Sequence, residues 1–174
     1  EDAYHGGVRT LELRRPEVRP DGTLEVKTRT VRVNIPAGVT EGQHMRLAGQ
    51  GEAIPGGKPG DLYLEIHIRP HPLYQLDGRD VTLTLPIAPW EAALGATVTV
   101  PTLGGPVEMR IPAGAQSGQK LRLRGRGLPG TPPGDQFVQL KVVLPPADTP
   151  QARALYERMR REMAFDPRAD FPPR

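Results

Sequence analysis

The sequence has no cysteine and only one serine, and these absences exclude several kinds of chemistry. Without cysteine there is no disulfide, no thiol nucleophile and no cysteine-ligated zinc site. A serine nucleophile needs a histidine base and an orienting partner, and the sequence around Ser117 offers no such pattern. The four histidines lack the helical spacing with glutamate that a zinc protease uses. The sequence therefore predicts a protein that is not an enzyme and that needs no metal or cofactor.

Long apolar runs and aromatic residues are also scarce. No run of about 18 apolar residues occurs, so the sequence predicts no transmembrane helix and no membrane partner. Hydrophobic residues make up 37% of the 174 residues and aromatic residues 5%, which is typical of a β protein with a thin core. No signal peptide pattern opens the chain. We therefore expect a cytoplasmic protein.

Acidic residues are nearly as frequent as basic ones, which leaves a formal net charge of +3. A nucleic-acid-binding surface needs a dense basic stripe with aromatic residues between the charges. Arg122, Arg124 and Arg126 alternate along one segment, but acidic residues are interspersed elsewhere. This pattern favours a solvated strand face, and nucleic-acid binding is the less favoured interpretation.

Two segments of the chain have nearly the same sequence. Residues 35–51 read IPAGVTEGQHMRLAGQG, and residues 111–127 read IPAGAQSGQKLRLRGRG. Upstream of these segments, DAYHGG at 2–7 is echoed by EAALGA at 91–96. A repeated order of motifs predicts two tandem copies of one small β unit. Because the first residues already lie inside a copy, the sequence also indicates a fragment of a longer protein.

Apolar and polar residues alternate in several short segments, which predicts β-strands. Two of these segments, 8–14 and 23–35, flank Asp21-Gly22, a hairpin turn signal. Their same-face residues are Arg9, Leu11 and Leu13 on the first strand and Val31 and Val33 on the second. Short strands with turn residues between them predict an all-β fold of two tandem, homologous, β-sandwich-like domains.

Both copies continue through a proline-rich turn into a Gly-Asp pair that opens an alternating segment. Asp61 and Asp135 occupy this same place, and their recurrence predicts a role in the turn rather than in catalysis. The segment PWEAALGA at 89–96 can form about one helical turn that ends at Gly95.

The chain changes character after the second copy. Thr149 can cap a helix and Pro150 suits its first position. An apolar stripe follows at steps of three and four residues, formed by Leu155, Tyr156, Met159 and Met163. We expect an extended tail beyond Asp166-Pro167. The predicted parts are therefore a first domain at 1–72, a second domain at 73–148, and a helix and tail at 149–174.

The predicted helix and the apolar strand faces each have two interpretations. The helix packs against its own domain, or it pairs with a second copy of the chain; because it follows the last repeat, self-association is favoured. The side chains of Leu11, Leu13, Val31 and Val33 form plain core, or they line a shallow groove beside a free strand edge. Such a groove accepts an extended peptide by strand addition.

Taken in order, the motifs strongly resemble the C-terminal substrate-binding and dimerisation region of the DnaJ-type J-domain co-chaperones. The motifs that carry the resemblance are DAYHGG, VNIPAGVTEGQHMRLAGQGE, GDLYLEIHIRPHP, LYQLDGRDVTLTLPI, EAALGATVTVPTLGG and IPAGAQSGQKLRLRGRGLP. Together they cover nearly the whole chain. The resemblance implies a dimeric clamp that binds exposed apolar segments of unfolded client polypeptides and presents them to a DnaK-type ATP-driven chaperone.

The resemblance also implies roles for particular residues. The client groove maps to Leu11, Leu13, Val31 and Val33, and the dimer contact maps to Leu155, Tyr156, Met159 and Met163. Arg9 and Arg29 are candidates for binding the acidic tail of the partner chaperone. The rival interpretations are a scaffold dimer without a client groove and a basic nucleic-acid-binding β module.

The chain departs from the family pattern in two places. Many members carry a zinc-binding, cysteine-rich insertion in the first domain, but the corresponding stretch at 14–23 has no cysteine, so zinc is not implied. The J domain with its His-Pro-Asp signature is absent from this sequence, since the HPL at 71–73 is a different motif. Stimulation of an ATPase is therefore not expected from this part.

Overall fold

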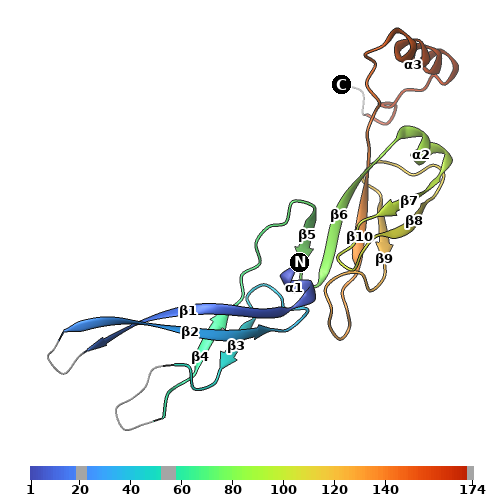
Figure 1. The fold of residues 1–174 in the computed structure, drawn as a ribbon. Helices are drawn as coiled ribbons and strands as arrows, with labels where there is room; N and C mark the ends of the chain where they lie inside the picture. The colour runs from blue at the N-terminus through green and yellow to red at the C-terminus, as the bar shows by residue number, and fades with distance from the viewer. Residues whose placement is uncertain (19–22, 52–57, 172–174) are drawn as a thin grey trace.

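The computed structural model describes residues 1–18, 23–51 and 58–171. The predicted turn at Asp21-Gly22 and part of the loop at 50–60 lie outside the described residues. Strands predominate over helices, as Figure 1 shows, which confirms the all-β class. In the described parts of the chain, no helix has the length and apolar character needed to cross a membrane.

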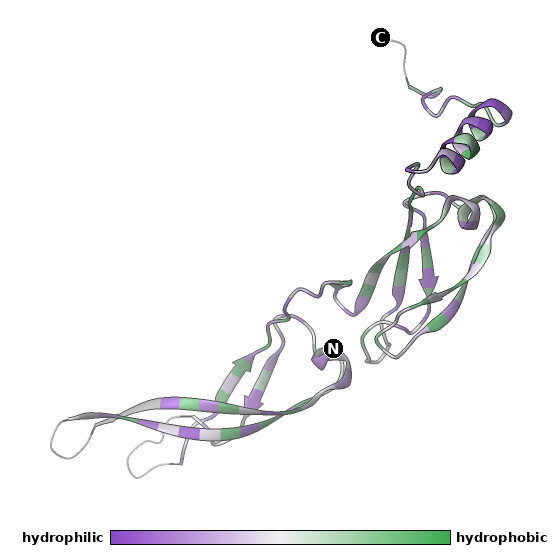
Figure 2. Cartoon of the chain, turned by 45° about the horizontal axis from the view of Figure 1, so that its top comes forward, coloured by the Kyte–Doolittle hydropathy of each residue, from purple (hydrophilic) through white to green (hydrophobic). Residues whose placement is uncertain are grey.

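The first copy of the repeat consists of one short helix and two pairs of strands. Its elements are α1 (Asp2–His5), β1 (Gly7–Val18), β2 (Leu24–Ile35), β3 (His44–Leu47) and β4 (Leu62–Glu65). The strands β1 and β2 form a long antiparallel ribbon, and β3 and β4 form a second antiparallel pair. The ribbon extends away from the rest of the molecule (Figure 1). Its residues alternate between hydrophilic and hydrophobic along both strands (Figure 2), as the sequence pattern predicts.

The second copy is larger because two further strands precede it. Its elements are β5 (Tyr74–Asp77), β6 (Asp80–Ile87), α2 (Pro89–Leu94), β7 (Ala96–Val100), β8 (Val107–Ile111), β9 (Lys120–Leu123) and β10 (Gln136–Val142). Four strands form one sheet in the order β5-β6-β10-β9, in which β6 and β10 are parallel. The pair β7–β8 packs with this sheet around a core that contains Val100, Ile111, Val138 and Leu140. The predicted helical turn that ends at Gly95 is confirmed.

The aspartate after each proline-rich turn closes that turn, as the repeat predicts. In the first copy, the Asp61 carboxylate accepts hydrogen bonds from the Gly49 backbone N–H at 2.9 Å and from Arg46 Nε at 2.7 Å. The Gly49 N–H, followed by the Arg46 guanidinium, holds the pKa of Asp61 below its usual value. The carboxylate thereby ties the end of β3 to the start of β4.

The second copy repeats this arrangement and adds a link to β6. The Asp135 carboxylate accepts from the Gly125 N–H at 2.7 Å and from Arg122 Nε at 2.6 Å. The backbone N–H of Asp135 donates in turn to Asp80 at 2.8 Å. The turn before β10 is therefore anchored to β9 through a side chain and to β6 through the main chain.

The two copies approach each other closely at two glycines. Gly38 has a φ of 81°, and a Cβ atom added there would lie 1.9 Å from the carbonyl oxygen of Pro129. A Cβ at Gly104 would lie 2.5 Å from the hydroxyl of Tyr4. Glycine is therefore required at Gly38 both for its conformation and for the approach of the second copy.

The C-terminal helix α3 (Pro150–Glu162) follows β10 and stands apart from the sheets (Figure 1). Thr149 Oγ1 accepts from the Ala152 N–H at 3.1 Å, so the predicted N-cap is confirmed. The prediction of an extended tail is wrong for residues 166–171, which form successive turns. The Asp166 carboxylate accepts from the Arg168 N–H at 2.9 Å, and this bond favours a turn over an extended chain.

Candidate functional site: the ribbon face and its cleft

The six predicted groove and tail-binding residues lie on one face of the β1–β2 ribbon. Directly opposite residues of an antiparallel pair point to the same side of the sheet. The register places Arg9 opposite Val33, Leu11 opposite Val31, and Leu13 opposite Arg29. We call this surface the ribbon face; it comprises Arg9, Leu11, Leu13, Arg29, Val31 and Val33. The fold therefore brings together all six residues, although their binding roles stay predictions.

Burial differs between the two strands of the ribbon face. Val31 and Val33 on β2 are buried, and they belong to the core of the first copy. Leu11 and Leu13 on β1 are only half-buried, and the two arginines are exposed. The core and groove interpretations therefore apply to different strands. The valines support the surface from below, and the leucines are the side chains that a ligand can reach.

A cleft of about 840 Å³ lies between the ribbon and the chain that runs through β4 into residues 66–71. Three residues of the ribbon face line it, namely Arg9, Leu11 and Val33, whereas Leu13, Val31 and Arg29 lie outside it. The opposite wall includes Met45, Leu64, Ile66 and Ile68. The sequence did not predict that these residues would form a wall of the cleft. The alternation in DLYLEIHI was its signal, but a strand pattern alone does not say which apolar face stays open.

Arg9 already has a partner within the first copy. Its guanidinium lies 2.5 Å from a carboxylate oxygen of Asp2 in α1. The hydrogen bond from Arg9, together with its positive charge, holds the pKa of Asp2 below its usual value. An acidic ligand would therefore compete with Asp2 for Arg9, while Arg29 lies further along the ribbon from this pair.

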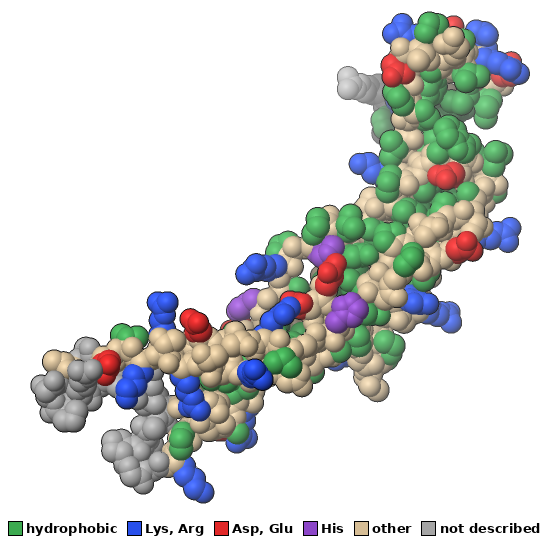
Figure 3. Space-filling model, in the orientation of Figure 1, with side chains coloured by type: hydrophobic (Ala, Val, Ile, Leu, Met, Phe, Trp, Pro, Cys, Tyr) green, Lys and Arg blue, Asp and Glu red, His purple; other side chains and the backbone are tan. Residues whose placement is uncertain are grey.

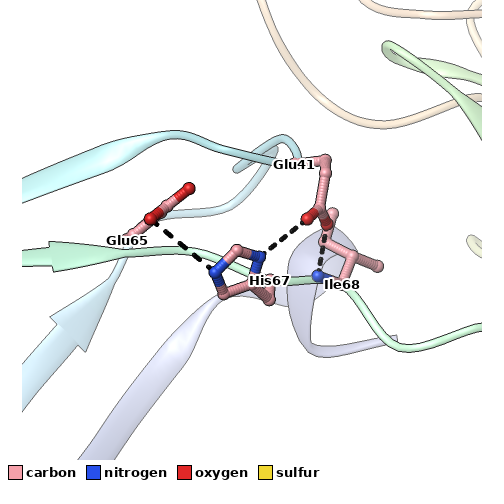
Figure 4. Close-up of polar contacts among 4 residues, drawn as sticks. All are labelled: Glu41, Glu65, His67 and Ile68. Atoms are coloured by element: carbon pink, nitrogen blue, oxygen red, sulfur yellow. Dashed lines mark hydrogen bonds and ion pairs between the residues drawn. The ribbon is translucent and has the colours of Figure 1, made fainter.

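A cluster of one histidine and two glutamates lies at the rim of the cleft (Figure 4). His67 Nδ1 lies 2.9 Å from Glu41, whose other carboxylate oxygen accepts from the Ile68 N–H at 2.5 Å. His67 Nε2 lies 3.8 Å from Glu65. Because a carboxylate only accepts, the imidazole must donate to Glu41. The cluster fastens the cleft wall at residues 67–68 to the loop that contains Glu41.

The His67–Glu41 contact makes stability depend on pH. The hydrogen bond to Glu41 raises the pKa of His67 above 6.5, so its contribution is present below pH 6.5 and is lost as the pH rises through the raised pKa. The Ile68 N–H and then His67 lower the pKa of Glu41 below 4.5, so its contribution is present above pH 4.5 and is lost as the pH falls through the lowered pKa. The contact is strongest between these values.

We expect the difference in Tm between wild type and His67→Ala to be largest near pH 5.5 and to shrink by pH 8.5, because the imidazole is then neutral. Thermal unfolding followed by circular dichroism across this pH range measures the difference. His44→Ala is the control, because His44 is exposed on the neighbouring strand and has no carboxylate contact in the part of the chain that the structure describes. A Tm difference that does not vary with pH contradicts the assignment.

The apolar stripe of α3 faces solvent. Leu155 is 67% exposed and Met159 47% exposed, and Met163 lies just beyond the end of the helix. Tyr156 differs, because its hydroxyl donates to the Pro145 carbonyl at 2.6 Å and ties the helix to its own chain. The stripe is therefore not packed against the second copy. Further apolar side chains gather around α2 and the end of β10 (Figure 3), namely Trp90, Leu94, Val143 and Leu144.

Comparison with known proteins gives a consistent result. The family model described as "DnaJ C terminal domain" matches residues 1–145. The chain is 54% identical over 173 residues to the Curved DNA-binding protein of Coxiella burnetii, an alignment that covers 98% of this chain and 55% of that protein. It is 42% identical over 175 residues to the protein of the same name from Pseudomonas syringae, covering 98% and 56%. For the protein of that name from Escherichia fergusonii, the identity is 46% over 167 residues, covering 94% and 55%. The chain thus spans about half the length of these curated relatives.

Proposed function

The chain belongs to the DnaJ C-terminal domain family, and on this basis we propose that it is the client-binding and dimerisation part of a DnaJ-type co-chaperone. It binds exposed apolar segments of non-native polypeptides and presents them to a DnaK-type ATP-driven chaperone. The proposed first domain at 1–72 binds the client, the second at 73–148 supports it, and the part at 149–174 joins two protomers.

The observation that carries this proposal is the half-burial of Leu11 and Leu13 beside the cleft. Apolar side chains that already lie on a supported surface lose little conformational freedom when a ligand covers them. Each square ångström of apolar surface that a client covers contributes about 25 cal/mol. A surface without specific polar contacts accepts many sequences, which suits unfolded polypeptides as ligands.

The exposed arginines of the ribbon face support the proposed contact with an acidic tail of the partner chaperone. Arg29 is exposed, and Arg9 is held near the cleft by Asp2. Guanidinium groups pair well with carboxylates, so the two arginines suit an acidic chaperone tail. Because Arg9 has a competing partner, Arg29 carries the larger share of this contact.

The exposed stripe on α3 supports the proposed dimer. Leu155 and Met159 form a continuous apolar contact surface at a three- to four-residue spacing. A dimer brings two ribbon faces to one client molecule, and two weak sites on one dimer gain affinity by effective concentration. The dimer thereby converts shallow surfaces into a clamp.

The test is a chemical-shift titration of the isotope-labelled chain with an unfolded, apolar-rich polypeptide at two salt concentrations. We expect salt-tolerant shifts that cluster on residues 9–14 and 29–35, because apolar contacts are not screened by ions. Absence of any shift at saturating polypeptide contradicts client binding. Shifts confined to arginines and abolished by salt favour nucleic acid instead.

DNA binding is the second candidate function, because the curated relatives are named Curved DNA-binding protein. The basic residues in and just after β9 support this candidate: Lys120 and Arg122 are exposed on one face of the strand, and the exposed Arg124 follows in the next turn. Arg122 is partly neutralised by Asp135, however. Measured DNA affinity that falls steeply and linearly with the logarithm of salt concentration, and that drops further in Arg124→Ala, supports this function.

A further inference from the structure

The short helix α1 lies at the inner end of the ribbon (Figure 1), and its first residues line the cleft. The Gly38 N–H donates to the Ala3 carbonyl at 2.7 Å. Just after the helix, the backbone at Gly6 approaches the end of β2 so closely that a Cβ atom there would lie 2.7 Å from the Ile35 carbonyl oxygen. The backbone of α1 is therefore held by contacts that do not depend on its acidic side chains.

The two acidic side chains at the start of α1, Glu1 and Asp2, contact opposite walls of the cleft. Asp2 pairs with Arg9 of the ribbon face at 2.5 Å. Glu1 lies 3.9 Å from Nε2 of His71, which belongs to the wall that continues from β4. All four residues line the cleft. Two neighbouring carboxylates of one segment thus already contact basic groups on both sides of it.

The hydrogen bonds of His71 show which of these two contacts is the stronger. Its Nδ1 accepts from the backbone N–H groups of Leu73 and Tyr74 at 3.1 and 3.3 Å. A ring nitrogen that accepts carries no proton, so the proton of the neutral imidazole lies on Nε2 and faces Glu1. At 3.9 Å this contact is longer than a hydrogen bond. Asp2 therefore makes the stronger contact and Glu1 the weaker.

The second copy shows that the Asp2–Arg9 pair is not a general feature of the repeat. Asp2 corresponds to Glu91, since DAYHGG matches EAALGA. The Glu91 carboxylate accepts from the Ala88 N–H at 2.7 Å and thereby caps α2. The position equivalent to Arg9 is Val98. The ion pair is therefore particular to the copy that carries the ribbon face.

An acidic peptide needs the same guanidinium that Asp2 occupies. Guanidinium groups bind carboxylates through short, charge-assisted hydrogen bonds, and Arg9 already donates to Asp2. Because Asp2 is tethered beside Arg9, it competes as if present at high concentration. The side chains of the pair are 54% and 69% exposed, and exposed ion pairs are weak. A ligand can therefore displace Asp2 by side-chain rotation, while α1 stays in place.

The second arginine of the ribbon face lies within reach of the same ligand. Among the described residues, no ion pair involves Arg29. Arg29 is opposite Leu13, four positions along β1 from Arg9. A rise of about 3.3 Å per residue separates the two arginines by roughly 13 Å along the ribbon. An extended acidic peptide of about four residues spans this distance.

We propose that Asp2 is the specificity-determining residue of this acidic-peptide site and acts as an internal competitor for Arg9, with Glu1 in a minor role. While Asp2 holds Arg9, only Arg29 is available, so a peptide with a single carboxylate binds poorly. A peptide with several carboxylates displaces Asp2 and binds both arginines. This role of Asp2 rests on the proposed contact with an acidic chaperone tail, and it adds a selection for tails with several negative charges.

Fluorescence anisotropy with two labelled, C-terminally amidated peptides tests the role of Asp2. One peptide carries glutamate at several successive positions, and the other carries glutamine at the same positions. We expect Asp2→Asn to bind the glutamate peptide about 2- to 5-fold more tightly than the wild type, because the ligand no longer has to break an exposed ion pair. Glu1→Gln should have a smaller effect. The affinity for the glutamine peptide should be the same in the wild type and both variants.

The matched control is Glu65→Gln. Glu65 lines the same cleft and carries the same charge, but its basic neighbour is His67 at 3.8 Å. This variant should bind the glutamate peptide like the wild type, and circular dichroism verifies that each variant is folded. An equal gain in Glu65→Gln and Asp2→Asn means that only the overall charge of the cleft matters. That outcome overturns the proposal, and so does an unchanged affinity in a folded Asp2→Asn variant.

A rescue experiment measures the release of Arg9 independently. Arg29→Ala should weaken binding of the glutamate peptide, because Arg9 stays paired with Asp2. Adding Asp2→Asn should restore part of the affinity, and a further Arg9→Ala should remove most of that gain. A gain that Arg9→Ala leaves undiminished overturns the competitor role.

Failure of the competitor role and failure of the proposed function give different results. If the wild type binds the glutamate peptide and Asp2→Asn binds it equally, the contact with an acidic tail stands and only the role of Asp2 is overturned. If neither the wild type nor any variant binds it, both are overturned.

Discussion

Replacing Leu13 with aspartate is expected to weaken the binding of an unfolded, apolar-rich polypeptide on the order of 10- to 100-fold. Leu13 lies half-buried on the ribbon face, outside the cleft and opposite Arg29. The substitution removes apolar contact area and places a charge where the client would cover it, and burying an unpaired charge is costly. Fluorescence anisotropy with a labelled client peptide measures the affinity. Leu11→Asp should have a similar effect on binding but a larger effect on stability, because Leu11 also lines the cleft.

The control for this experiment is Val8→Asp. Val8 is exposed on the same strand but on the opposite face of the ribbon. The Val8→Asp substitution introduces the same charge but leaves the ribbon face unchanged, so the affinity for the client peptide should stay at the wild-type value. Circular dichroism and sedimentation verify that each variant is folded and keeps its oligomeric state. Unchanged affinity in a folded Leu13→Asp variant removes Leu13 from the binding surface.

Replacing Met159 with glutamate is expected to shift the chain from dimer to monomer, with the dimer dissociation constant raised on the order of 10- to 100-fold. Met159 lies on the exposed stripe of α3 together with Leu155. In a dimer it becomes buried, and a carboxylate at that place loses its hydration without gaining a partner. Sedimentation velocity over a series of protein concentrations measures the change.

The matched control is Ala154→Glu, which adds the same charge to the same helix away from the stripe. Ala154 is exposed in the structure, and alanine and glutamate are both strong helix formers. This variant should sediment like the wild type. A wild-type chain that is monomeric at every concentration contradicts the proposed dimer, and so does a Met159→Glu variant that dimerises normally.

Features that depend on local sequence were predictable. The N-cap at Thr149 needs only one side chain and the following backbone, and Gly95 ends α2 through its own positive φ. The alternation of β1 and β2 placed the six residues of the ribbon face together, because strand side chains have a period of two. The turn role of Asp61 was visible because the repeat offers two examples of the same turn.

Features that depend on distant pairing were not predictable. The alternation in β6 has the same period whether its partner is parallel or antiparallel, so the sequence did not reveal its pairing with β10. The four-residue helix α1 is too short for a periodic signal, and only its echo of α2 hinted at it. The tail around Asp166 contains prolines that suggest an extended chain, but the aspartate side chain decides for a turn.

The alternation of apolar and polar residues also does not predict which side chains of the ribbon face are buried and which are accessible. Leu11 and Val33 alternate in the same way, yet one is half-buried and the other is fully buried. The difference arises from neighbouring elements, which no single strand encodes. The resemblance supplied the expectation of client binding, and the structure supplied the separation between supporting and accessible side chains.

The parallel pairing of β6 with β10 has a consequence for synthesis on the ribosome. Asp80 and the backbone of Asp135 are joined by a hydrogen bond across 55 positions of sequence. One edge of β6 pairs with the nearby β5, but its other edge has no partner until β10 has left the exit tunnel, whereas α2 and the hairpin β7–β8 form from nearby residues. Contacts between distant residues form slowly because a long loop must close first. The nascent chain thus passes through an interval in which β6 exposes one open hydrogen-bonding edge and the apolar side chains that β10 later covers.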